Sequence, residues 1–339
     1  DYFARGLMKK ILKKTLLLFL FFCLVFALYL FVVNVPQIED TSWGVNFSQK
    51  QSKDLGLDWK EAYLALLDDL KVKKIKLITH WDLLEPEQDN YFFDDLDWQI
   101  KEARERDVQI LLAIGMKTPR WPECHIPKWA EQKDKEGQQE RITALLKEIV
   151  LRYKNEPSIN MWQVENEPFV PFGVCPWVDK AFLKKEIELV KSLDDKNRKI
   201  LISDSGEGSF WIVAANLGDI VGTTMYEKVW IHQIGAYFTY PYPPVFYGRK
   251  AQIIKKIFNK EVICVELQAE PWSPEQLVNT SIEKQDETMN LEKFQQNIEF
   301  AKKSGLKEFY LCGGEWWYWM KEKQDNPEIW DEAEKLFIQ

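Results

Sequence analysis

Short apolar runs alternate with longer amphipathic stretches along most of the chain, beginning at Trp43. Each run is rich in β-branched, aromatic or other apolar residues and is bounded by polar or turn-forming residues, which is typical of buried strands. The eight runs are Trp43–Phe47, Ile75–Thr79, Val108–Ile114, Ile159–Val164, Ile200–Ser203, Ile220–Met225, Val262–Val265 and Phe309–Cys312. Each run has the length of a single strand in a sheet.

Between these runs, apolar residues recur at the spacing of one helix face. Such stretches are Trp59–Leu70, Leu96–Arg106, Ile142–Tyr153, Ala181–Leu193 and Leu291–Ser304. Strands that alternate with helices pair in parallel through crossover connections. Eight is the number of strands that closes such a sheet into a barrel. The pattern therefore predicts an α/β fold, a (β/α)8 TIM barrel, over residues 43–339.

The first 36 residues form a separate unit. Basic side chains precede an uninterrupted apolar run from Leu16 to Val33, about the ~20 residues that a membrane-spanning helix needs; they are Arg5, Lys9, Lys10, Lys13 and Lys14. Basic flanks remain in the cytoplasm, which places the rest of the chain outside the membrane. We predict a basic stub and single-pass anchor over residues 1–36, with a cleaved signal peptide as the alternative. Residues 37–42 would be a linker, and no core residue of the barrel is expected from residues 1–36.

Composition narrows the possible partners. The chain has 45 Lys and Arg against 53 Asp and Glu, a net charge of −8, which disfavours nucleic acid as a partner. Only three His are present, without Cys-x-x-Cys or His-Glu-x-x-His motifs, so no metal site is expected. Phosphate-binding glycine loops and the Gly-x-Ser-x-Gly motif of esterases are also missing, so no cofactor is expected.

Polar and aromatic residues cluster directly after the predicted strands. In a TIM barrel these positions meet at one rim, where the chemistry of such barrels takes place. The residues are Asn46, His80, Trp81, Asp82, Lys117, Thr118, Asn166, Glu167, Asp204, Tyr226, Glu227, Glu266, Glu315, Trp316 and Trp317. A rim that gathers carboxylates, amides, a His and several Trp favours a functional site over a chance group of polar residues, so this rim is the expected site.

Three segments carry a resemblance to a known group of enzymes. Met161–Pro168, which contains Asn166-Glu167-Pro168, resembles the fourth-strand signature of the retaining glycoside hydrolases of clan A. Val262–Leu267, with Glu266, is similar to the nucleophile segment on the seventh strand of that clan. Trp81–Glu87 resembles the second-strand loop of its xylanase-like and β-galactosidase-like families. The resemblance covers residues 43–339.

The resemblance implies roles for several residues. Glu167 would be the general acid and base, Glu266 the nucleophile, and Asn166 a partner of the sugar 2-hydroxyl. Tyr226, at the end of the sixth strand, would hydrogen-bond the nucleophile or be an ordinary strand-end aromatic. For the acid, Glu165 lies two residues earlier on the same strand face and remains an alternative. For the nucleophile, Glu270 is the alternative, although its place in a loop favours Glu266.

Weaker substrate contacts are expected from other rim residues. His80 would bond a sugar hydroxyl or be a structural histidine, and Trp81 belongs to the second-strand motif. Trp316 or Trp317 resembles the aromatic platform of the clan, and strand alternation would turn only one of the two inward. The Tyr- and Pro-rich segment 237–247 would be a loop that forms a sugar-stacking wall, an oligomer contact or a packed surface.

The sequence therefore predicts a membrane-anchored retaining glycosidase that hydrolyses a β-linked oligo- or polysaccharide outside the cytoplasm. A transglycosylase with the same two glutamates is the first alternative, and a non-catalytic carbohydrate-binding barrel is the second. The motifs leave open the sugar, the linkage, exo or endo action and the oligomeric state.

Cysteine placement yields one structural expectation. Cys124 and Cys175 fall in the loops after the third and fourth strands, which are neighbours in a barrel. An oxidising exterior would let them form a disulfide. Cys264 and Cys312 lie within apolar strands and are expected to be small buried residues.

Overall fold

The structure is a computed structural model that describes residues 2–36, 38, 40–176, 179–232 and 234–338. Parts of the anchor, linker and barrel predictions fall on residues 1, 37, 39, 177, 178, 233 and 339, which lie outside this description.

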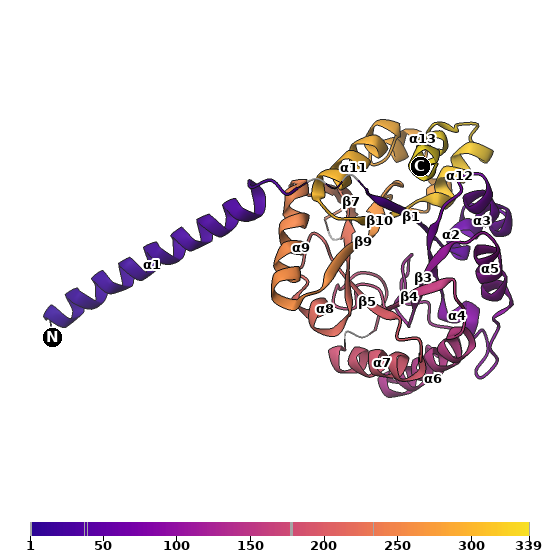
Figure 1. The fold of residues 1–339 in the computed structure, drawn as a ribbon, viewed down its shortest axis with the longest axis horizontal. Coiled ribbons are helices and arrows are strands. Elements are labelled where there is room, and N and C mark those ends of the chain that lie inside the picture. The colour runs from indigo at the N-terminus through magenta and orange to yellow at the C-terminus, as the bar shows by residue number, and fades with distance from the viewer. Residues whose placement is uncertain (1, 37, 39, 177–178, 233, 339) are drawn as a thin grey trace.

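The strands confirm the predicted barrel. Eight parallel strands close in the order β1-β10-β9-β6-β5-β4-β3-β2 (Figure 1). They are β1 (Ser42–Phe47), β2 (Lys74–Ile78), β3 (Gln109–Ile114), β4 (Ile159–Val164), β5 (Lys199–Asp204), β6 (Ile220–Met225), β9 (Glu261–Gln268) and β10 (Glu308–Cys312). The observed β1 includes Ser42, which pairs with Glu308 and belonged to the predicted linker. All eight predicted runs are strands because a barrel buries both faces of its sheet, so that each strand is mainly apolar.

Helices surround the barrel and run between its strands. The five predicted helices correspond to α3 (Trp59–Asp68), α5 (Asp94–Glu105), α6 (Lys135–Tyr153), α7 (Lys180–Leu193) and α11 (Leu291–Ser304). Their N-termini are fixed by side-chain caps where the sequence offers one, as at Asp58, Asp134 and Asn290. The further helices are α2 (Gln49–Asp54), α4 (Trp81–Leu84), α8 (Ile212–Leu217), α9 (Pro244–Phe258), α10 (Ile282–Asp286), α12 (Gly314–Lys323), α13 (Glu328–Phe337) and the short 3-10 helix η1 (Leu277–Asn279).

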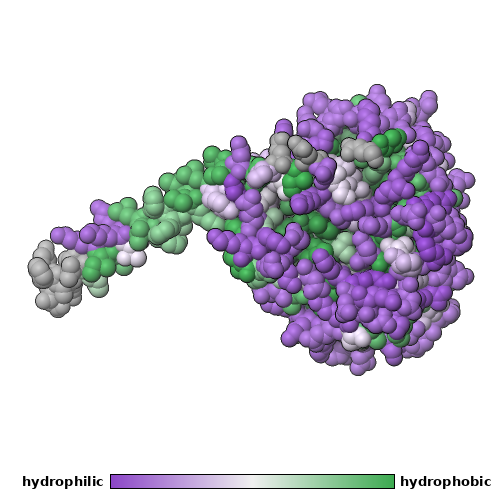
Figure 2. All heavy atoms as spheres, viewed as in Figure 1, coloured by the Kyte–Doolittle hydropathy of each residue, from purple (hydrophilic) through white to green (hydrophobic). Residues whose placement is uncertain are grey.

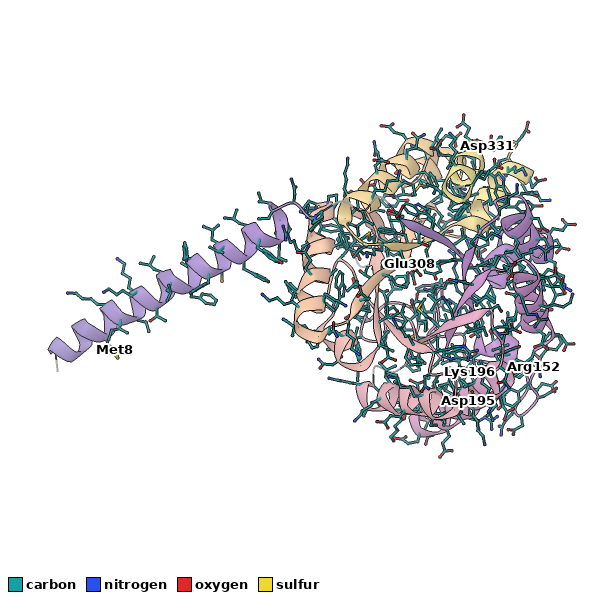
Figure 3. All side chains as sticks on the ribbon, in the orientation of Figure 1. Met8, Arg152, Asp195, Lys196, Glu308 and Asp331 are labelled. Atoms are coloured by element: carbon teal, nitrogen blue, oxygen red, sulfur yellow. A yellow bond between two sulfur atoms is a disulfide. The ribbon has the colours of Figure 1, made fainter. Side chains whose placement is uncertain are left out.

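The core has two layers. Apolar residues that face the helices form the larger cluster, and a smaller separate cluster contains Leu111, Met161, Leu201, Ile220, Ile263, Val265 and Tyr310. The members of the smaller cluster come from different barrel strands, as expected for the packed interior of a TIM barrel. In Figure 3, Glu308 at the start of β10 lies among the strands, whereas Arg152 of α6 lies in the outer helical layer. The interior of the barrel is therefore filled by side chains, so a substrate would have to bind at the rim.

The segment after β6 differs from the expectation. Residues 237–247 were expected to form one loop, but part of them pairs as an antiparallel hairpin, β7 (Lys228–Ile231) with β8 (Ala236–Thr239). Pro244 then begins α9, because a proline fits the first turn of a helix without losing a hydrogen bond. The pattern of apolar runs does not predict this hairpin, because its strands are short and only partly buried.

The N-terminal helix α1 (Tyr2–Phe31) projects away from the barrel (Figure 1). Its stretch Lys10–Phe31 has a mean hydropathy of 2.4 and is a candidate membrane span, since few of its side chains are buried in the protein. Figure 2 shows this stretch as a continuous apolar surface beside a mainly hydrophilic barrel. Both a retained anchor and a signal sequence fit this helix.

The end of α1 nevertheless packs on the barrel, so the expectation that residues 1–36 supply nothing to the core is wrong. Leu30 and Val35 are buried, and the ring of Phe31 stacks on Phe246 of α9 at 5.3 Å. Arg249 of α9 donates a hydrogen bond from Nε to the carbonyl oxygen of Val33 at 3.0 Å. The apolar run ends in residues that belong to the barrel, and no sequence pattern distinguishes them from the rest of the run.

Cys124 and Cys175 form the predicted disulfide, with Cα atoms 5.2 Å apart. The bridge joins the loop after β3 to the loop after β4. Cys264 and Cys312 are buried free thiols, as predicted. The two loops beside the fourth strand are therefore held together at the rim.

Truncation at two positions tests the packing of α1 on α9. A chain of residues 29–339 keeps Leu30, Phe31 and Val35, whereas a chain of residues 37–339 loses them. Full burial of one Leu or Phe side chain contributes about 1.5–3 kcal/mol, so we expect the shorter chain to be less stable by about 2–4 kcal/mol. Chemical denaturation followed by circular dichroism measures the difference. Equal unfolding free energies would show that the contact adds no stability.

Candidate active site

Two carboxyl groups reach the rim from strands on different sides of the barrel. Glu167 follows β4, and Glu266 lies near the end of β9; β5 and β6 separate these strands in the sheet. Both side chains are buried. They are close enough for the charge of Glu266 to raise the pKa of the Glu167 carboxyl. The structure thus brings together the two glutamates singled out in the sequence.

Glu266 has a donor for each carboxylate oxygen. Lys76, a fully buried residue of β2, places Nζ 3.1 Å from Oε1. The hydroxyl of Tyr226 donates to Oε2 at 2.9 Å. Burial is the main cause that raises the pKa of Tyr226 well above its usual value, and the negative charge of Glu266 adds to it, so the phenol keeps its proton. The carboxylate is therefore oriented by two donors, one of them cationic.

The carboxyl of Glu167 is buried near the negative charge of Glu266. Burial raises the pKa of its carboxyl well above the usual value, and the negative charge of Glu266 raises it further. Its backbone is fixed, because the amide donates to Oγ of Ser203 at 2.8 Å and Nζ of Lys117 donates to its carbonyl oxygen at 3.0 Å. A carboxyl whose pKa is raised in this way is suited to give a proton to a leaving group.

Asn166 is bound by the protein on its oxygen side. Oδ1 accepts from Nε2 of Gln163 at 2.9 Å and from Oγ of Ser203 at 3.2 Å. The Nδ2 amide lies near Glu123, the pKa of which it lowers, and has no other hydrogen-bond partner among the described residues. The amide group is therefore the part of Asn166 that a substrate hydroxyl could meet.

A third carboxyl, Glu123, was missed in the sequence. It lies in the loop after β3, buried, with Oε2 3.4 Å from Nζ of Lys117. Burial is the main cause that raises its pKa to about 8, and the negative charge of Glu266 adds to it. No strand pattern points to a residue so far into a loop. Its neighbour Cys124, expected to bridge to the fourth-strand loop, was the available signal.

The two alternative glutamates are engaged elsewhere. The carboxylate of Glu165 accepts hydrogen bonds from the backbone amides of Met116 at 2.7 Å and Lys117 at 2.6 Å. Glu270 forms an ion pair with Arg120, which also reaches Glu315 at 3.1 Å. Both alternatives therefore stabilise loops in this structure.

His80 lies in a buried polar cluster below the rim. Its Nε2 is 3.0 Å from Oγ of Ser48 and its Nδ1 is 3.5 Å from Oγ1 of Thr118, while its ring contacts that of His125. Burial is the main cause that lowers its pKa well below the usual value, so the ring is neutral. Of the two interpretations left open for His80, this setting favours the structural one.

The structure does not bring the expected Trp residues to the site. Trp81, Trp316 and Trp317 are almost fully buried in the core, and each indole Nε1 donates to a protein acceptor. The expectation that only one of Trp316 and Trp317 turns inward is wrong, because both lie on helix α12 instead of on a strand. Their ring faces pack against protein, which leaves no open platform for a sugar.

Among the residues that the structure describes, no group of three or more His, Cys, Asp or Glu is arranged to hold a metal ion. The side chains described at the rim include carboxyl groups, a phenol and two buried ammonium groups.

The structure is a closed parallel barrel with carboxyl groups near the ends of its fourth and seventh strands, the arrangement that the resemblance to the clan A glycoside hydrolases implies. A family model described as β-galactosidase matches residues 57–200. This span includes Asn166 and Glu167 and ends before β9. A search of curated protein sequences found no match.

Solved structures share the fold. A β-galactosidase from a Rahnella species has a TM-score of 0.55 and 11% identity, over 90% of this chain and 57% of its own. A GH5_18 enzyme from Bifidobacterium longum has a TM-score of 0.57 and 12% identity, over 81% of this chain and 70% of its own. A xylanase from Thermotoga petrophila has a TM-score of 0.52 and 14% identity, over 83% of this chain and 86% of its own.

The chain spans little more than half the length of the β-galactosidases that it matches. The predicted resemblance to the clan A glycoside hydrolases is confirmed by the family model and these neighbours together.

The raised pKa of Glu123 predicts how stability depends on pH. Between the usual value of 4.5 and the folded value of about 8, the folded chain keeps a proton that the unfolded chain has released. Folded stability therefore falls as pH rises through this window, by up to about 1.4 kcal/mol per pH unit for one such group. Glu123→Gln removes this titration, so its unfolding free energy should fall less steeply between these limits.

Urea denaturation at a series of pH values measures both slopes. The exposed Glu131 lies in the same loop, and Glu131→Gln is the matched control that should keep the wild-type slope. A slope that is equally steep in Glu123→Gln and wild type would show that Glu123 is ionised in the folded protein.

Proposed function

We propose that the protein hydrolyses a β-linked glycoside with retention of configuration, with Glu167 as general acid and base and Glu266 as nucleophile. The observation that carries this proposal is the contrast between two neighbouring carboxyl groups. Glu167 is buried beside other negative charges, which raises its pKa, while Glu266 lies between Lys76 and the hydroxyl of Tyr226. Pairs of carboxyl groups in opposite environments are the means by which glycosidases divide the roles of acid and nucleophile.

The reaction follows in two steps. Glu167 gives its proton to the glycosidic oxygen while an oxygen of Glu266 attacks the anomeric carbon, so the leaving sugar departs as an alcohol. The ionised Glu167 then takes a proton from water, which attacks the same carbon and releases Glu266. Two displacements restore the original configuration. Tyr226 holds the attacking carboxylate in place, and the amide of Asn166 is available to the sugar 2-hydroxyl.

The place of action is proposed to be outside the cytoplasm. The candidate span Lys10–Phe31 follows basic residues, which favours a cytoplasmic N-terminus. The disulfide between Cys124 and Cys175 supports an oxidising compartment for the barrel. We propose a single-pass membrane protein, with a secreted form after cleavage as the alternative.

The first substrates to test are β-galactosides, because the matching family model is described as β-galactosidase. Gluco-, manno- and xylo-configured β-glycosides belong in the same panel. One of the GH5_18 structures of similar fold was determined with the disaccharide Manβ1-4GlcNAc.

Replacement of the nucleophile tests the assignment. Glu266→Gly should lose at least about a thousandfold in kcat on an activated aryl β-glycoside, since it removes covalent catalysis. Added azide should restore turnover by filling the vacated space and should yield a glycosyl azide of inverted configuration. Product analysis by NMR measures both the rate and the configuration.

Glu270→Gly is the matched variant, because Glu270 follows the same strand but pairs with Arg120. It should retain the hydroxyl product and show no azide rescue. Rescue of Glu270→Gly instead of Glu266→Gly would overturn the assignment. Wild-type products that incorporate an added acceptor sugar in place of water would identify a transglycosylase, and wild-type binding without turnover would identify a binding barrel.

A further inference from the structure

Four aromatic side chains form a continuous row from the nucleophile to the surface; we call it the aromatic row. Trp272 packs edge-on against Tyr226, with ring centroids 5.0 Å apart. Phe172 contacts Trp272 at 5.7 Å, and Trp121 contacts Phe172 at 6.1 Å. The row begins at Tyr226, which is hydrogen-bonded to Glu266. It therefore leads outward from the reacting carboxylate.

Each member of the row comes from a different loop of the rim. Trp121 follows β3, Phe172 follows β4, Tyr226 follows β6 and Trp272 follows β9. On its outer side the row is extended by the hairpin β7–β8, where His232 lies 6.3 Å from Trp121 between ring centroids. Aromatic residues from separate loops meet here without belonging to the packed core, as is typical of a binding surface.

The outermost member is unusually exposed. Trp121 is 60% exposed, in contrast to five nearly fully buried tryptophans, which are Trp81, Trp162, Trp211, Trp316 and Trp317. An exposed indole leaves apolar area in water that burial would stabilise, at about 25 cal/mol per Å². A ligand that packs on this ring would recover that energy. Sugars present flat C–H faces, which suit such a surface.

The loops that hold Trp121 and Phe172 are fixed to one another. The Cys124–Cys175 disulfide joins them, and the amide of Val174 donates to the carbonyl oxygen of Pro122 at 2.9 Å. Gly173 has a φ of +87°, and a Cβ at this position would lie 2.7 Å from that same oxygen. The close approach of the loops thus requires a glycine. The loops of Trp121 and Phe172 are thus linked before any ligand binds, and such a linkage lowers the entropy lost on binding.

The position of the row indicates which part of a substrate it would hold. Phe172 lies on the segment that follows the acid, Glu167, and Nζ of Lys117 binds the carbonyl oxygens of both Glu167 and Val170 in that segment. The acid protonates the leaving group, so this side of the site receives the leaving sugars.

We propose that the aromatic row binds sugar units on the leaving-group side of the cleaved bond, so that the substrate is a β-linked chain and not a glycoside with a small leaving group. This inference rests on the proposed glycosidase function. It adds a role for Trp121 and Phe172 in binding the sugar chain. The disulfide would hold their two loops together.

Two kinds of substrate separate this role from the chemical step. A β-glycosyl fluoride reacts at the anomeric carbon and places no sugar on the leaving-group side, whereas a matched series of β-linked di- to pentasaccharides does. For the full chain in detergent we expect kcat/KM to rise with chain length. Trp121→Ala should lower the ratio of kcat/KM on the pentasaccharide to that on the fluoride by about tenfold, the size of one aromatic contact. Trp121→Phe keeps a ring and should recover much of the ratio.

The control is Phe92→Ala, since Phe92 is 45% exposed in the loop after β2, outside the row. It should leave the ratio at the wild-type value. Turnover of the fluoride with no rise along the oligosaccharide series, or an equal ratio in Trp121→Ala and wild type, would overturn the chain-binding role alone. Failure of the wild type to turn over any gluco-, galacto-, manno- or xylo-configured fluoride would overturn the proposed function itself.

Discussion

The ion pair between Lys76 and Glu266 joins β2 to β9 inside the mouth of the barrel, and the rest of the site is arranged around it. A fully buried ammonium loses several kcal/mol of hydration, so it requires a carboxylate partner with good geometry. The pair balances the charge of Glu266, and Tyr226 takes the remaining carboxylate oxygen. Burial is the main cause that raises the pKa of the neighbouring Glu167, and the negative charge of Glu266 adds to it.

A second buried ammonium organises the acid side of the site. Lys117 contacts the Glu123 carboxyl and the carbonyl oxygens of Glu167 and Val170, and its own amide donates to Glu165. One side chain therefore links the loop after β3 to the loop after β4, beside the disulfide that joins the same loops. The loops that hold the acid also hold Trp121 and Phe172, so the acid and the outer half of the aromatic row share two loops that a disulfide joins.

The chain by itself determined the barrel and its principal pair of glutamates. Eight apolar runs separated by amphipathic stretches specify a closed parallel sheet, because both faces of each strand are buried and every crossover needs a helix. Once the strands are assigned, their ends must meet at one rim, which places Glu167 and Glu266 near each other. The same reasoning brings Cys124 and Cys175 together, because consecutive strands are neighbours in the barrel.

Only the tertiary structure decided which rim residues are free to meet a substrate. Trp316 and Trp317 were predicted to be aromatic residues at the rim. Helix α12 begins before them, however, and both side chains are buried in the core. Glu123 and Trp121 lie deep in a loop, where no periodic pattern operates, and their positions depend on contacts with distant segments. Leu30 lies within the apolar run like any membrane residue, yet it is buried in the core of the barrel. The periodic spacing of apolar residues indicates which face of a helix or strand is buried. The positions of loop residues, and the element against which a buried residue packs, are set by long-range packing.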